Sequence, residues 1–126
     1  MRHFVAYHNA MTMGYSCTDI SELHVQTNRP VHGLEGVTVW LIAGEGRSPK
    51  SYFLTSKFVA TDCGLNLIPG TKFRNRISGL GTLFRKGVPL AGKPLLERVR
   101  KESANFVRGF YETTDLEVIE GLGVLA

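Results

Sequence analysis

The chain has 126 residues, of which 43% are hydrophobic and 21% charged, and its formal net charge is +4. This length suits one domain over residues 1–126, and the composition excludes a wholly disordered chain. No apolar run approaches the ~20 residues that a membrane span needs, and two cysteines are too few for a disulfide framework. We therefore expect a cytoplasmic protein without contact to a membrane.

Strand patterns dominate the first half of the chain. Alternating segments at 3–7 and 22–27 predict short strands, with a loop over 8–20. The strongest strand is predicted at 36–43, because its sequence GVTVWLIA is rich in β-branched and aromatic residues. Residues 50–61 carry apolar groups on both faces, which indicates a central strand that pairs with 36–43 in an antiparallel hairpin.

The second half adds two strands, a helix and a last strand. Strands are predicted at 72–78 and 82–85, around a turn at Gly79-Leu80-Gly81. The segment 94–107 is the one convincing helix, since Pro94 suits its first turn and its apolar residues form one stripe. The tail at 116–122 predicts a last strand. The expected fold class is α+β: a small curved β-barrel of about six short strands with one packed helix.

The charge is distributed unevenly along the chain. Residues 72–108 carry 10 basic and 2 acidic side chains, residues 1–71 are balanced, and residues 109–126 carry 4 acidic side chains and no basic one. A basic block of this kind attracts polyanions, because neutralising phosphates releases counterions. The alternatives are a solvated face that pairs with the acidic tail, and a site for a small anion or a membrane surface.

Motifs for catalysis, metal binding and cofactors are missing from the sequence. Cys17 and His24 lack the spacing of a zinc site, and no paired carboxylates are present. A Cys/His pair near the N-terminus is conceivable, but no nucleophile elbow surrounds any serine or cysteine. Gly44-Glu45-Gly46 lacks the rest of a nucleotide-binding loop. We therefore expect no enzyme, no metal and no cofactor.

Aromatic and polar side chains at strand ends are the best candidates for a binding site. A nucleic-acid base can stack on such rings or be flipped into a pocket that they line. The candidates for this pocket are Tyr7, His8, Asn9, Trp40 and Tyr52. Asn9 could read a base edge through its amide. Trp40 also fits a plain core position, because it lies in the most apolar strand.

The glycine-led strand Gly-Val-Thr-Val-Trp, the Tyr-His-Asn near the start and the basic second half resemble the PUA-like superfamily, and EVE-type domains within it. Similar segments are fused to HNH nucleases in modification-dependent restriction. The resemblance implies a reader of a modified base, with DNA favoured over RNA and with a possible effector nuclease as partner. It also implies that basic residues hold the backbone phosphates; the candidates are Arg47, Lys50, Arg74, Arg76, Arg85 and Lys86.

Two other functions stay open at this point. The basic face could contact an acidic protein, which would make the chain an interaction domain. The region of Tyr7, His8 and Asn9 could instead serve a small enzyme or a small-molecule binder.

Overall fold

The computed structural model describes residues 2–9, 23–45, 51–67, 70, 72–106 and 108–126. For Asn9, Arg85 and Lys86 it describes the backbone alone. Six strands form one sheet in this described part of the chain. The strand order across the sheet is β2-β5-β4-β3-β1-β6, and all neighbours pair antiparallel except β1 and β3, which run parallel. The bounds are β1 His3–Asn9, β2 His24–Thr27, β3 Thr38–Glu45, β4 Ser51–Leu65, β5 Asn75–Pro89 and β6 Phe110–Thr113.

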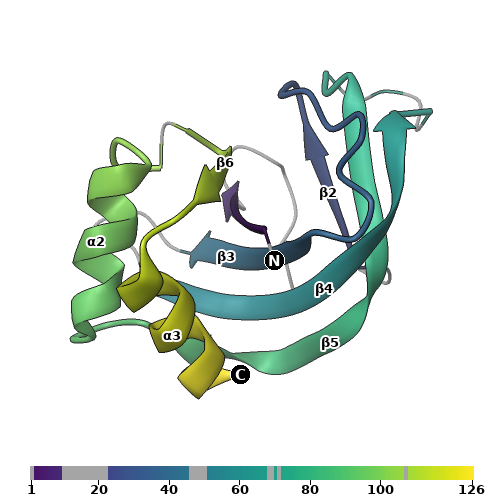
Figure 1. The fold of residues 1–126 in the computed structure, drawn as a ribbon. Coiled ribbons are helices and arrows are strands. Elements are labelled where there is room, and N and C mark those ends of the chain that lie inside the picture. The colour runs from purple at the N-terminus through teal and green to yellow at the C-terminus, as the bar shows by residue number, and fades with distance from the viewer. Residues whose placement is uncertain (1, 10–22, 46–50, 68–69, 71, 107) are drawn as a thin grey trace.

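The sheet curls into a half-barrel whose two edges are β2 and β6 (Figure 1). The long strands β4 and β5 bend along their length and carry most of this curvature (Figure 1). The strands predicted at 3–7, 22–27 and 36–43 are confirmed with small shifts at their ends, as is the antiparallel hairpin of β3 with a central β4. The expected small curved barrel is thus found as an open half-barrel, and the described residues include two helices rather than one.

The turn predicted around Gly79 and Gly81 is wrong, because β5 runs through both glycines without a break. A Cβ atom on Gly79 would overlap the carbonyl oxygen of Val59, and one on Gly81 would overlap that of Lys57. Glycine stands at these positions because the backbones of β4 and β5 approach each other closely. The two short strands expected here are therefore one long, bent strand.

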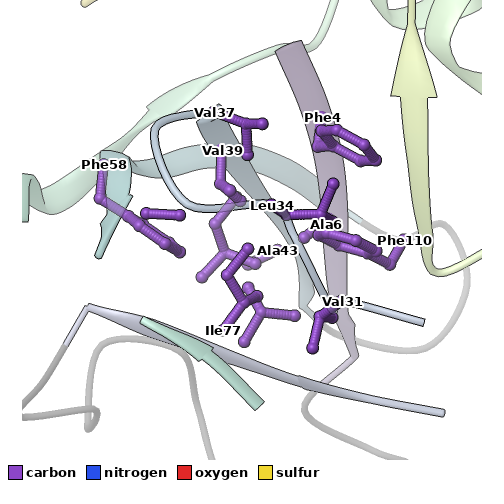
Figure 2. Packing of buried hydrophobic residues seen from close by; sticks show 13 residues of the cluster. Phe4, Ala6, Val31, Leu34, Val37, Val39, Ala43, Phe58, Ile77 and Phe110 are labelled. Carbon is purple, nitrogen blue, oxygen red and sulfur yellow. The ribbon is translucent and has the colours of Figure 1, made fainter. Parts of the chain in front are cut away.

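Both faces of strand β3 are buried. Val39 and Ala43 point into the cluster inside the curl (Figure 2), to which Leu41 also belongs. Trp40 and Ile42 point into the cluster under the helices. Alternate residues of a strand face opposite sides, so an unbroken apolar strand can serve two cores at once. This explains why the sequence GVTVWLIA is strongly apolar and shows no alternation of polar and apolar residues.

A β-bulge in β4 decides which of its residues belong to which face. Leu41 pairs with Ser56 and Ile42 pairs with Leu54, so Thr55 is the extra residue. Its hydroxyl donates a hydrogen bond of 3.1 Å to the carbonyl oxygen of Leu41 and is buried. Because one residue is inserted, the side-chain alternation switches, and β4 presents Leu54 to the helices but Phe58 to the inside of the curl.

Helix α2 (Pro94–Glu102) packs on the convex side of the sheet with Leu95, Leu96 and Val99 buried. Pro94 begins it, as expected, because proline lacks the N–H that a first turn leaves unpaired. The helix ends five residues earlier than the predicted 94–107, and the chain leaves it through a left-handed turn.

Helix α3 (Leu116–Leu125) replaces the strand predicted at 116–122, which is wrong. The side chain of Asp115 caps the helix by accepting a hydrogen bond of 3.0 Å from the backbone N–H of Glu117. Val118 and Leu122, one helical turn apart, are both 0% exposed and bury one face of the helix. Neither helix in the described part of the chain combines the length and apolarity that crossing a bilayer requires.

Candidate functional site

Three aromatic rings meet on the convex side of the sheet, near the end of the parallel pair β1 and β3. Tyr7 comes from β1, Tyr52 from β4 and Phe106 from the turn after α2. The ring of Phe106 stacks on both tyrosines, with centroid distances of 4.4 Å to Tyr7 and 4.9 Å to Tyr52. The two tyrosine rings lie 6.2 Å apart and are tilted by 45°. Two of the five predicted pocket residues are therefore in contact with a common third ring.

The absence of a side chain at Gly44 makes room for the ring of Tyr7. A Cβ atom at position 44 would overlap the phenol oxygen of Tyr7, so the ring lies directly against the backbone of β3. The backbone N–H of Tyr7 donates a hydrogen bond of 2.8 Å to the carbonyl oxygen of Gly109. That bond ties β1 to the segment that follows the Phe106 turn, so the strand and the turn hold one another in position.

The phenol group of Tyr7 is a neutral hydrogen-bond donor at physiological pH. Burial, followed by the neighbouring Tyr52 and the charge of Glu45, raises the pKa of Tyr7 to about 12. The guanidinium carbon of Arg100 lies 5.9 Å from the centroid of the Tyr52 ring, within reach of a cation–π interaction. The cluster thus combines flat aromatic surface, a neutral O–H group and one positive charge.

The turn that carries Phe106 has an unusual backbone. Ala104, Asn105 and Phe106 have φ angles of 52°, 58° and 67°, all in the left-handed region. Three consecutive residues with a Cβ atom in this region are strained, because the Cβ crowds the following carbonyl oxygen. Phe106 is nonetheless only 8% exposed, since the turn delivers its ring onto the two tyrosines.

Trp40 is part of the core under the helices, in the same cluster as Phe106, and is 2% exposed. Its indole N–H donates a hydrogen bond of 3.0 Å to Nδ1 of His3. The ammonium group of Lys57 lies 4.8 Å from the centroid of the indole ring. Of the two interpretations of Trp40, the core position is the one that the structure describes.

His8 and Asn9 do not join the aromatic cluster either. His8 follows Tyr7 in β1 and therefore points to the opposite face of the sheet, where it is 4% exposed. The side chain of Asn9 lies outside the described residues. The strand end Tyr7-His8-Asn9 therefore does not present its side chains to a single site.

The predicted phosphate contacts are spread along β5 rather than gathered. Arg74 is exposed just before β5, and its backbone N–H donates a hydrogen bond of 2.9 Å to Oδ1 of Asn28. Arg76 is half-buried and pairs with Gln26 of β2. Arg85 and Lys86 lie toward the other end of the strand, with side chains outside the described part, and Arg47 and Lys50 lie wholly outside it.

Part of the basic block is neutralised by the acidic tail, as one of the sequence alternatives expects. Arg98 of α2 forms ion pairs of 2.9 Å with Asp115 and 3.1 Å with Glu117 at the start of α3. Arg100 contacts Glu97 one turn earlier in its own helix at 3.3 Å. Two cations of the basic block are therefore already paired with carboxylates.

Sequence reasoning missed Phe106 and Arg100 as members of the site. Phe106 fits the apolar stripe of the predicted helix, and no glycine marks the left-handed turn that removes it from that helix. Nothing in the sequence distinguishes Arg100 from the other basic residues between positions 72 and 108. Among the described residues, no cluster of three or more His, Cys, Asp or Glu side chains could hold a metal ion.

Comparison of the chain with protein-family models, with curated proteins and with solved structures finds no match. The candidate site is therefore identified from its own geometry and chemistry.

Proposed function

We propose that this chain is a non-enzymatic nucleic-acid-binding module that recognises a modified base in DNA. The observation that carries the proposal is the aromatic cluster of Tyr7, Tyr52 and Phe106, with the guanidinium of Arg100 beside it. The resemblance of the sequence to EVE-type domains of the PUA-like superfamily supports the same function.

The chemistry of the cluster suits a base that has left the stack. A flipped base offers a flat π face and a polar edge, and stacking it on an aromatic side chain contributes about 1–3 kcal/mol. Tyr7 and Tyr52 are half-buried, so each combines a supported ring with an accessible edge. The neutral Tyr7 phenol, with its raised pKa, is suited to donate to an acceptor on the base.

The charge distribution suits the phosphate backbone. Residues 72–108 keep an excess of positive charge after Arg98 is paired with Asp115 and Glu117. Arg74 and Lys72 are exposed ahead of β5, where solvent-facing cations can meet phosphates. The proposed activity is binding alone, so any cleavage belongs to an effector nuclease acting as partner.

The second candidate function is a protein-interaction domain, which one observation favours. Val59 of β4 and Leu80 of β5 pair directly across the sheet and are 41% and 77% exposed. Adjacent exposed apolar side chains of this kind suit contact with another protein. A small-molecule site at the end of β1 has less support, because Tyr7 and His8 point to opposite faces.

Fluorescence anisotropy with short duplexes tests the proposal, using plain, methylated and hydroxymethylated DNA beside RNA, at two salt concentrations. We expect salt-dependent binding that is tightest for one modified duplex. Tyr52→Ala should lower the preference for that duplex about 5- to 100-fold, the equivalent of losing one stacked base. Tyr52→Phe, which keeps the ring, should retain most of it.

Charge variants separate the backbone contacts from base recognition. Arg74→Ala should weaken binding to every duplex alike and reduce the salt slope by about 1. Arg2→Ala is the matched control, because Arg2 is an exposed arginine that is paired with Glu112 on the far edge strand. Equal binding of all duplexes would leave only a basic surface, and no binding at low salt would remove the proposal and favour the interaction domain.

A further inference from the structure

The faces of Tyr7 and Tyr52 that a base would stack on are covered by the ring of Phe106. It lies within 21° of parallel to Tyr7 and 26° of parallel to Tyr52, at ordinary stacking distances from both. We infer that Phe106 is a displaceable cap. Its ring occupies the position of the base and moves off the two tyrosines when a base binds. This inference rests on the proposed function, because it describes how the same site is regulated.

The backbone of the cap favours its release. Three successive left-handed residues, Ala104 to Phe106, store strain that an ordinary extended or helical backbone would relieve. Ala104 and Asn105 are exposed, so the cap can move without removing core contacts of these two residues. The closed state is thus held by the burial of the Phe106 ring and by local contacts, against the strain of this backbone.

Two side-chain contacts hold the cap closed, in addition to the backbone hydrogen bonds of the turn, such as that of 2.6 Å from the N–H of Asn105 to the carbonyl oxygen of Arg100. The hydroxyl of Ser103, buried, accepts a hydrogen bond of 2.9 Å from the backbone N–H of Phe106 and donates one of 2.7 Å to the carbonyl oxygen of Val99. Nε of Arg100 donates a hydrogen bond of 3.0 Å to Oδ1 of Asn105. The second contact is exposed, so water and anions can compete for it.

Arg100 connects the cap to the phosphate backbone. Its side chain is 38% exposed and already touches Glu97, Asn105 and the Tyr52 ring. A guanidinium in this position gains stronger, charge-assisted hydrogen bonds when a phosphate approaches, and the neutral Asn105 is the weaker competitor. Phosphate binding at Arg100 therefore loosens the turn, and the cap opens when nucleic acid is present.

Two neighbouring substitutions shift the cap in opposite directions. Ala104→Gly relieves the left-handed strain without touching a side-chain contact, so it should favour the closed state and weaken binding of the preferred modified duplex several-fold. Asn105→Ala removes the acceptor for Arg100 and tolerates the left-handed backbone less well, so it should favour the open state and strengthen binding several-fold. Phe106→Leu, which keeps the apolar bulk, should also strengthen binding.

The cap can be observed without any nucleic acid. With 4-fluorophenylalanine at all phenylalanines, the ¹⁹F signal of residue 106 is identified by its loss in Phe106→Leu. We expect two exchanging states for this signal, with the second more populated in Asn105→Ala and less populated in Ala104→Gly. Adding the preferred duplex to the unsubstituted protein should drive the signal into the second state.

The two readouts distinguish failure of the cap from failure of the proposed function. Shifted ¹⁹F populations in variants that bind no duplex would support the cap and overturn nucleic-acid recognition. Tight duplex binding with one unchanged ¹⁹F state in both variants would overturn the cap. Weaker binding by Phe106→Leu would also overturn it, because Phe106 would then be a fixed wall of the site.

Discussion

The indole N–H of Trp40 donates a hydrogen bond of 3.0 Å to Nδ1 of His3. Nδ1 can accept this bond only when it carries no proton, so the imidazole must be neutral. Burial, and then nearby positive charge including that of Lys57, lowers the pKa of His3 below the ordinary value of 6.5. The contact between β1 and β3 is therefore sensitive to acid.

The first prediction concerns this pH dependence. The unfolded chain takes up the proton near pH 6.5, whereas folded His3 takes it up only at lower pH, so the contribution of His3 to stability is complete above pH 6.5. It should be lost as the pH falls through the lowered pKa. Urea unfolding at a series of pH values, followed by the fluorescence of the single tryptophan, measures this.

His3→Asn is the control for that experiment, because asparagine keeps a polar side chain that does not titrate. The difference in unfolding free energy between the two proteins should shrink as the pH falls below 6.5. A difference that stays constant from about pH 8 to about pH 5 would contradict the role assigned to His3.

The second prediction concerns the contact of Gly44 with Tyr7. Gly44→Ala places a Cβ atom against the Tyr7 phenol oxygen and should destabilise the fold by about 1–3 kcal/mol. Tyr7→Phe removes that oxygen, so the double variant should lose less stability than the sum of the two single losses. A double-mutant cycle by urea denaturation checks the coupling, and strict additivity would contradict the contact.

The third prediction concerns the close approach of β4 and β5. Gly79→Ala drives a Cβ atom into the backbone carbonyl of Val59, which cannot move aside, and should cost about 3 kcal/mol. Gly64→Ala, at a β4 position with open space around it, should change stability by less than about 1 kcal/mol. Similar thermal midpoints for the two variants would mean that the strands are not so close.

The fourth prediction concerns Ser103. Ser103→Ala leaves the buried N–H of Phe106 without its partner, which costs about 1–3 kcal/mol. The exposed Ser51 in β4 provides the matched change, and Ser51→Ala should be almost neutral. Chemical denaturation of both variants measures the difference. Equal stability would show that the turn does not depend on this hydroxyl.

The strands and α2 could be predicted because their local patterns agree with their final environment. The segment around Trp40 is apolar throughout, and it lies between two cores, so every residue in it has a place. The start of α2 at Pro94 likewise follows from the chemistry of one residue. In these segments propensity and burial favour the same structure.

The errors occur where tertiary contacts override the local pattern. Gly79 and Gly81 have the chemistry of a turn, but a neighbouring strand passes too close for any side chain. The tail from Leu116 has the pattern of a strand, yet two features favour a helix: the side chain of Asp115 caps the N-terminus of α3, and Arg98 forms ion pairs with its first turn. The first case depends on a strand distant in sequence, and the second depends in part on the distant Arg98.

The candidate site was predictable only in part, for a related reason. Tyr7 and Tyr52 are predictable as pocket residues because they are polar aromatics near strand ends, and the sheet brings them together. Trp40 was drawn into the core because its strand is covered on both faces. Phe106 reaches the site through a left-handed turn that no local residue type demands, so sequence periodicity placed it on the helix instead.

The position of β1 between β3 and β6 has a consequence for biosynthesis. β1 lies near the start of the chain and β6 near the end of the described part, yet they pair from His3 with Thr113 to Ala6 with Phe110. On the ribosome, one edge of β1 must wait until β6 has emerged, with its backbone groups unpaired in the meantime. The contact of Tyr7 with Phe106 is subject to the same delay. A nascent chain therefore acquires its aromatic site only after Phe106 has emerged, and products terminated before this residue lack it.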